Sequence, residues 1–237
     1  RDIRMSKYVI TFDEDIHKYK INGEDAISVT TFLKAIGISA GVDGIPPKVL
    51  EAARQRGNYY DKLAAEAVDD DFDLTRWQER FLETLEKHKL KITKSQQIYG
   101  TMDPINICGT GDFEGEKIIA DLKATNEIYL TSVTWQTNIY AWLKDPKGYE
   151  EWQKFVIHYN EKDDRFTVLE LKNVPIANIK HAIECYQLGE TYKESLQETN
   201  EIVDIKAFSE VFDKVKEYED QLKEEKKKLD GFYESIK

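Results

Sequence analysis

Two strands and the turn between them are predicted by GTGDFEGEKIIADLK, residues 109–123 of this 237-residue chain. Apolar residues lead into Asp112 and again into Asp121, and the segment around Gly115 favours a tight turn. The two apolar segments are therefore expected to pair as a hairpin. If the hairpin closes near Gly115, Asp112 lies across from Asp121.

The alternation of side chains along a strand places Asp121 and Lys123 on one face and Leu122 on the other. Asp112 would join them, so two carboxylates and an ammonium group converge. Hard cations such as Mg²⁺ bind carboxylate oxygens and keep several waters. A divalent ion held in this way can activate a water and stabilise the leaving oxygen of a phosphodiester. The pattern predicts a site for metal-assisted hydrolysis, in which Lys123 positions the nucleophile or offsets charge.

A helix over residues 132–143 is expected to follow, with Gln136 and Tyr140 four positions apart on one face. The tryptophan at position 135 could stack on a nucleobase, but its spacing with Ile139 favours the core.

The motifs G-T-x-D (109–112), D-x-K (121–123) and Q-x-x-x-Y (136–140), in this order, resemble those of the PD-(D/E)XK nuclease superfamily, in its RecB-like and phage exonuclease branch. The resemblance covers about residues 8–143. It implies a restriction-endonuclease-like core and hydrolysis of DNA phosphodiesters with Mg²⁺ or Mn²⁺. The site residues that it implies are Asp112 and Asp121 as metal ligands, Lys123 to orient or activate water, Gln136 to position substrate or Lys123, and Tyr140 and Thr125 as further substrate-binding residues.

A predicted helix over residues 48–68 contains RGNYYD, residues 56–61, which resembles the R-G-x-x-x-H segment of the same superfamily. Asp61 stands where many members have a metal-binding histidine. An aspartate can bind Mg²⁺, so an altered metal preference, a degraded site, and Glu66 as a substitute acid all remain open. Gly57 is expected to let the helix pack closely on the sheet.

A second G-T-x-D occurs at YGTMD, residues 99–103. If Asp103 were the first acid, the hairpin would turn through residues 108–115. Asp112 is preferred because the apolar segment 105–108 leads toward it.

The composition fits a folded core, with 41% hydrophobic and 11% aromatic residues. The net charge of −11 argues against binding of nucleic acid by bulk electrostatics. It does not exclude a nuclease, because a metal site needs carboxylates and the DNA can be held by enclosure or by a partner. Cys108 and Cys185 fit no metal-binding spacing and favour a reducing cytoplasm. The resemblance implies that this is the cytoplasm of a bacterium or a phage-infected cell. No apolar run is long enough to predict a membrane span.

The predicted fold class is α/β, a restriction-endonuclease-like core with a mixed central sheet flanked by helices, an N-terminal β-hairpin and a C-terminal helical tail. Residues 1–200 are assigned to the nuclease-like domain and 201–237 to a charged helix that packs on it or serves association. The other segments expected to be regular are strands over 8–12, 17–21, 26–29, 91–99, 152–159 and 165–171, and helices over 32–36 (capped by Thr30 or Thr31), 77–90 (capped by Asp73 or Thr75) and 176–192.

The resemblance implies DNA and a single-strand annealing or recombination protein as partners, with a homo-oligomer as a further possibility. The alternative function is a catalytically inactive nuclease-fold module that binds DNA or a protein.

Overall fold

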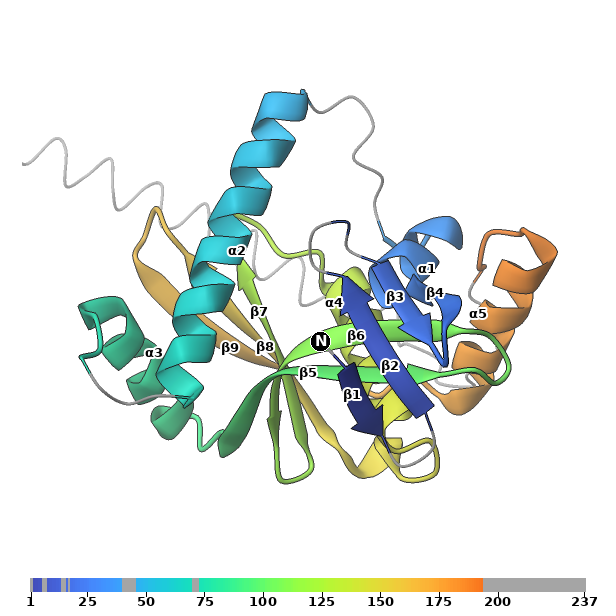
Figure 1. The fold of residues 1–237 in the computed structure, drawn as a ribbon. Helices are drawn as coiled ribbons and strands as arrows, with labels where there is room; N and C mark the ends of the chain where they lie inside the picture. The colour runs from blue at the N-terminus through green and yellow to red at the C-terminus, as the bar shows by residue number, and fades with distance from the viewer. Residues whose placement is uncertain are drawn as a thin grey trace, which may run out of the picture. The chain divides into compact units, whose positions relative to one another are not determined.

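The computed structural model describes residues 2–5, 8–13, 16, 18–39, 46–69 and 73–193 (Figure 1). The predicted helix over residues 201–237 lies outside the described residues, so the domain boundary at residue 200 stays a prediction. None of the helices in the described ranges is long and apolar enough to cross a membrane.

The central sheet is mixed, as predicted. Its strands are β5 (Ile92–Thr101), β6 (Ile107–Gly115), β7 (Ile118–Ala124), β8 (Gln153–Asn160) and β9 (Arg165–Leu171). The strands β5, β6 and β7 are antiparallel to one another in order, β8 pairs in parallel with β7, and β9 is antiparallel to β8. The second predicted hairpin, β8 and β9, lies beside the strand that carries Asp121, as expected.

The N-terminal part is larger than the predicted hairpin. It is an antiparallel meander of β1 (Asp2–Met5), β2 (Tyr8–Asp13), β3 (Lys18–Ile21) and β4 (Glu24–Ser28). The last of these strands pairs in parallel with β6, which joins the meander to the central sheet.

Helices cover both faces of the central sheet (Figure 1). Tyr99 and Ile119 face a cluster with α1 (Val29–Ala35), α4 (Leu130–Lys144) and α5 (Ile176–Leu188). Residues of the opposite face, including Phe113 and Leu122, pack with α2 (Pro47–Asp69) and α3 (Arg76–Lys87). The predicted class, a mixed α/β domain with a central sheet between helices, is confirmed.

Several helix ends differ from the predictions for local reasons. The N-cap of α1 is Ser28 rather than Thr30 or Thr31, because the Ser28 hydroxyl accepts a hydrogen bond from the Thr31 N–H at 3.1 Å. The helix α5 ends at Leu188 instead of residue 192, because Gly189 adopts a left-handed backbone with φ of 71°. For α3, Thr75 is the cap, as one of the two alternatives had it.

The hairpin between β6 and β7 is longer than predicted. The strand begins at Ile107 and continues to Gly115, so Asp112 lies within it and not at the end of a strand over 105–108. Glu114 and Gly115 pair with β7, and the turn is made by residues 116–117.

The prediction that Gly57 lets α2 pack closely on the sheet is wrong. A Cβ atom added at Gly57 would have no atom within 4 Å among the described residues. At Gly57 the surface of the helix faces open space.

Candidate functional site

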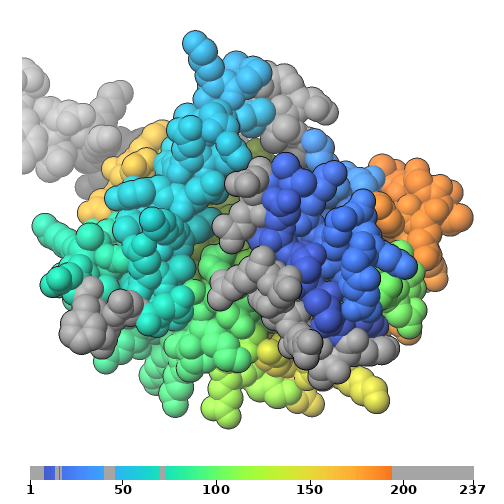
Figure 2. All heavy atoms as spheres, viewed as in Figure 1, coloured from blue at the N-terminus to red at the C-terminus, as the bar shows by residue number. Residues whose placement is uncertain are grey.

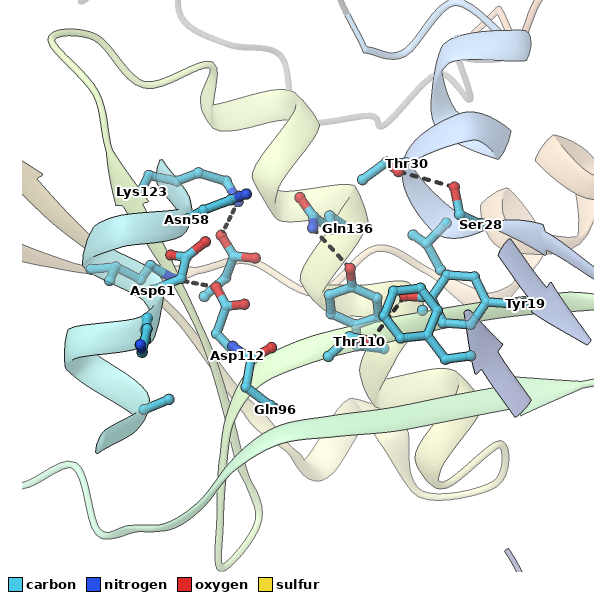
Figure 3. Close-up of a pocket in the computed structure, with 18 residues that line it drawn as sticks. Tyr19, Ser28, Thr30, Asn58, Asp61, Gln96, Thr110, Asp112, Lys123 and Gln136 are labelled. Carbon is cyan, nitrogen blue, oxygen red and sulfur yellow. Dashed lines mark hydrogen bonds and ion pairs between the residues drawn. The ribbon is translucent and has the colours of Figure 1, made fainter. Parts of the chain in front are cut away.

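A pocket of about 510 Å³ lies where β6, β7, α2 and α4 meet, and the N-terminal strands complete its wall (Figure 3). In the space-filling view of Figure 2, α2 (cyan) lies on the left and the N-terminal strands (blue) on the right of the face that is turned to the viewer. Of the predicted site residues, the pocket is lined by Asp61, Asp112, Asp121, Lys123, Gln136 and Tyr140.

The two strand carboxylates reach the pocket because the hairpin opens at this level. The ladder between β6 and β7 ends at the pair Phe113 and Ala120, and the next residues along the strands are Asp112 and Asp121. The Asp112 carboxylate accepts a hydrogen bond from the Leu122 N–H at 2.8 Å. The Asp112 carboxylate thereby satisfies a backbone N–H near the point where the ladder stops. This hydrogen bond holds Asp112 next to Asp121.

Lys123 completes the central group. Its Nζ lies 2.5 Å from Oδ2 of Asp121, whose residue is only 2% exposed. This oxygen has no further hydrogen-bond partner among the described residues. The side chain of Leu122 packs in the core on the opposite face, as the alternation predicts.

Asp61 of α2 adds a third carboxylate to the pocket (Figure 3). Burial, together with the charge of Asp121, raises the pKa of Asp61 to about 7 against the opposing effect of Lys123. Burial and the charges of Asp121 and Asp61 also raise the pKa of Asp112 well above its ordinary value. Burial alone would lower the pKa of Lys123, but Asp121 and Asp112 overcome it and raise this pKa. One ammonium group therefore faces more carboxylate charge than it offsets.

An excess of buried carboxylate suits a divalent cation. Mg²⁺ is commonly held by one or two carboxylates and otherwise by waters and substrate phosphates, and Asp112 and Asp121 fit that requirement. In the described ranges no group of three or more His, Cys, Asp or Glu side chains is arranged so that it could hold a metal ion. Asp112 and Asp121 are therefore the residues that could hold such an ion.

Gln136 and Tyr140 form the wall of the pocket on α4. The Gln136 amide donates to the Tyr140 hydroxyl at 2.9 Å, and the phenol ring is buried. A Cβ added at Gly109 would lie 2.5 Å from the Tyr140 ring. The absence of a side chain at Gly109, the first glycine of G-T-x-D, therefore leaves room for Tyr140, the tyrosine of Q-x-x-x-Y. The two motifs are thus in direct contact, although these two residues are 31 positions apart in the sequence. Thr110 between the glycines contacts the Tyr19 hydroxyl at 2.8 Å.

The structure does not bring Thr125 into the pocket lining. The strand β7 ends at Ala124 and the chain turns toward α4. The Thr125 hydroxyl donates to the carbonyl of Glu127 at 2.7 Å, and its own carbonyl contacts His158 at 2.6 Å. These contacts indicate a role in the turn.

The two alternative acids also lie outside the pocket lining. Asp103 is exposed in the connection between β5 and β6. The alternative hairpin with a turn through residues 108–115 is not formed, because β6 is continuous from Ile107 to Gly115. Glu66 is paired with Lys62 at 3.8 Å on the exposed side of α2.

Sequence reasoning missed Asn58 and Gln96, whose side chains also line the pocket (Figure 3). Asn58 precedes Asp61 by three residues, a helical spacing that could have placed both on one face. No sequence signal identifies Gln96.

No protein-family model matches the sequence, and no curated protein matches it significantly. Among solved structures, an alkaline exonuclease (LHK-Exo) from Laribacter hongkongensis is similar over 69% of this chain and 86% of that chain, with 10% identity and a TM-score of 0.44. A protein described as SSO0001 is similar over 58% of this chain and 69% of that chain, with 18% identity and a TM-score of 0.35. At these TM-scores the similarity defines neither the family of the chain nor its chemistry.

Proposed function

We propose that the protein is a metal-dependent DNA nuclease of the PD-(D/E)XK type that hydrolyses phosphodiester bonds. The observation that carries this proposal is the convergence of Asp112, Asp121 and Lys123 in one pocket, with Gln136 on its wall. These side chains come from β6, β7 and α4, and they are the residues on which the resemblance to this superfamily rests.

Each residue has a separate part in the proposed reaction. Asp112 and Asp121 would hold a Mg²⁺ or Mn²⁺ ion, which supplies Lewis-acid stabilisation of charge on the phosphoryl oxygens. The Lys123 ammonium, already fixed by Asp121, donates to the attacking water or to a phosphate oxygen. The Gln136 amide, held against Tyr140, orients the strand at the cleaved bond. Asp61 is proposed as an additional ligand from α2.

The proposal extends to an exonuclease that acts in phage-type recombination or repair, in the cytoplasm of a bacterium or a phage-infected cell. A single-strand annealing or recombination protein would be its partner, and association of several copies is a further part of the proposal. These roles follow from the resemblance alone.

A second candidate function is an inactive nuclease-fold module that binds DNA or a protein. Two observations favour it: Asp61 replaces the histidine of the motif, and Lys123 occupies the Asp121 carboxylate at 2.5 Å.

The test is cleavage of end-labelled linear duplex, closed circular and single-stranded DNA with Mg²⁺ or Mn²⁺, comparing the parent with Lys123→Ala. Loss of linear DNA alone, dependent on metal and abolished by the substitution, is expected for the exonuclease. Failure of the folded parent to cleave any substrate in the presence of metal contradicts the enzyme and favours the binding module. Lys117→Ala is a matched control, since Lys117 lies in the turn outside the pocket lining and pairs with Asp145 and Glu151.

A further inference from the structure

Gln96 has an unusual backbone in the middle of a central strand. It lies in β5 with φ of 48°, in the left-handed region that residues other than glycine rarely adopt. The flanking ladder pairs, Ser95 with Phe113 and Gln97 with Gly111, place it opposite Asp112. The distortion therefore occurs at the level of the first acid of the proposed site.

At the level of Gln96, the side chains of the paired strand β6 change the face of the sheet to which they point. A Cβ added at Gly111 would lie 3.5 Å from Tyr140, and Glu114 accepts hydrogen bonds from Lys144. Both partners belong to α4, although positions three apart on a regular strand point to opposite faces. The alternation thus shifts by one residue between Gly111 and Glu114, at the level of Gln96.

Glycine would adopt this backbone without the steric cost of a Cβ atom. The chain instead has a glutamine, and its side chain lies in the pocket beside Asp112 (Figure 3). Strained conformations that persist at a pocket point to a function of the residue that carries them. The left-handed backbone alone therefore does not explain why this position carries an amide side chain.

The charges of the pocket indicate what the amide would do. The only cationic side chains of its described lining are Lys62 and Lys123, against three carboxylates. Lys62 is 77% exposed, and Lys123 is engaged with Asp121. The amides of Gln96 and Asn58 make no hydrogen bond within the ranges that the structure describes, so their N–H groups are available as neutral donors.

We infer that Gln96 and Asn58 bind the nucleic-acid strand beside the cleaved bond, as neutral donors to phosphate oxygens, and that the left-handed backbone at Gln96 aims its amide there. This inference rests on the proposed function. It gives an acidic protein a way to hold a polyanion next to carboxylates without a basic groove, since amide donors need not release counterions from the substrate.

The test compares Gln96→Gly with Gln96→Val in steady-state cleavage, Mn²⁺ titration and thermal unfolding. Glycine keeps the backbone and removes the amide, so we expect an unchanged Mn²⁺ affinity, an unchanged or higher Tm, and a KM raised by roughly 10-fold to 100-fold for a lost bond to a charged group. Valine disfavours the left-handed backbone, so it is expected to lower the Tm and the Mn²⁺ affinity as well.

Asn58→Ala is expected to raise KM by a smaller factor with the Tm unchanged. The controls are Gln153→Ala on β8 and Gln55→Ala on α2, whose side chains lie outside the pocket lining. A KM for Gln96→Gly equal to that of the parent overturns the inference while the nuclease function stands. A folded parent that cleaves no DNA overturns the function and the inference together.

The dependence of KM on salt gives an independent readout. With neutral donors and two lysines, the slope of log KM against log salt concentration is expected to be about 2 or less in magnitude. A slope of about 5 or more would show that basic side chains dominate binding, which contradicts the inference.

Discussion

Asp112 and Glu114 lie two residues apart on β6, yet their surroundings have opposite charge. Glu114 is 5% exposed and accepts hydrogen bonds from Tyr99 at 2.7 Å and from Lys144 at 3.0 Å on both oxygens. Lys94 adds a third donor at 3.1 Å. Burial alone would raise the pKa of Glu114, but these bonds bring it below its ordinary value.

Asp112 has the reverse environment. Its neighbours Asp121 and Asp61 are further carboxylates, and its hydrogen bond comes from a neutral backbone N–H. The acid with a full set of donors joins β6 to α4, whereas the acid that faces other carboxylates is the one proposed to bind a cation. The difference between these two acids is the physical basis of the proposed function.

The largest difference is expected in cleavage. Asp112→Asn and Asp121→Asn should each reduce kcat by roughly 100-fold to 1000-fold, the usual effect of removing one preorganised charge-stabilising group. In metal-free buffer the Tm of Asp112→Asn should be equal to or above that of the parent, because the substitution removes repulsion between carboxylates. Asp121→Asn also removes the ion-pair partner of Lys123 and should lower the Tm. Initial rates and thermal unfolding measure both quantities. A variant that is inactive only because it is unfolded would not support the role.

The second effect is stabilisation by metal. A divalent ion at 100 times its Kd stabilises the folded state by about 2.7 kcal/mol, which corresponds to a rise in Tm of about 5–10 °C for a chain of this length. Excess chelator should reverse the rise. Asp121→Asn should lose it and Glu114→Gln should keep it. An equal rise in all three proteins would place the ion elsewhere.

The third effect concerns Glu114, which is expected to contribute to stability and not to cleavage. Glu114→Gln removes a charged acceptor from Lys144 and Tyr99 and should lower the free energy of unfolding by about 1.5–3 kcal/mol, measured by denaturant titration. The rate of cleavage by the folded variant at low temperature should remain within about threefold of that of the parent. This is less than the tenfold change that about 1.4 kcal/mol would cause. A large loss of kcat with unchanged stability would contradict the structural role.

The smallest effect concerns pH. Because the pKa of folded Asp61 is raised to about 7, the folded metal-free protein holds a proton that the unfolded chain has released. Stability should therefore fall as pH rises from about 4 to about 7. Asp61→Asn should reduce this fall and raise the Tm at pH 8 by several degrees, with little change at pH 4. The part of the fall that remains comes from the raised pKa of Asp112. Parallel curves for the two proteins would contradict the assignment.

The sequence pattern was sufficient for the central hairpin and its acids. Period-two alternation placed Asp121 and Lys123 on one face, and pairing placed Asp112 near Asp121. Strong alternation also predicted β8 and β9. These features depend on local chemistry and on short sequence separations.

The parts that could not be predicted depend on contacts between distant segments. A left-handed residue in a strand is expected at glycine, so nothing in the sequence marks Gln96. The steric relation of Gly109 to Tyr140 needs the packing of α4 on β6. Gly57 suggested close packing, but the fold leaves that position open.

The most direct test of the difference between the two acids is the position of a bound ion. Crystals of the parent soaked with Mn²⁺ should show an anomalous peak between the carboxylates of Asp112 and Asp121, and crystals of Asp121→Asn should not. A peak at Glu114, or no peak in the parent at millimolar Mn²⁺, would contradict a metal-dependent site at the opening of the β6–β7 hairpin.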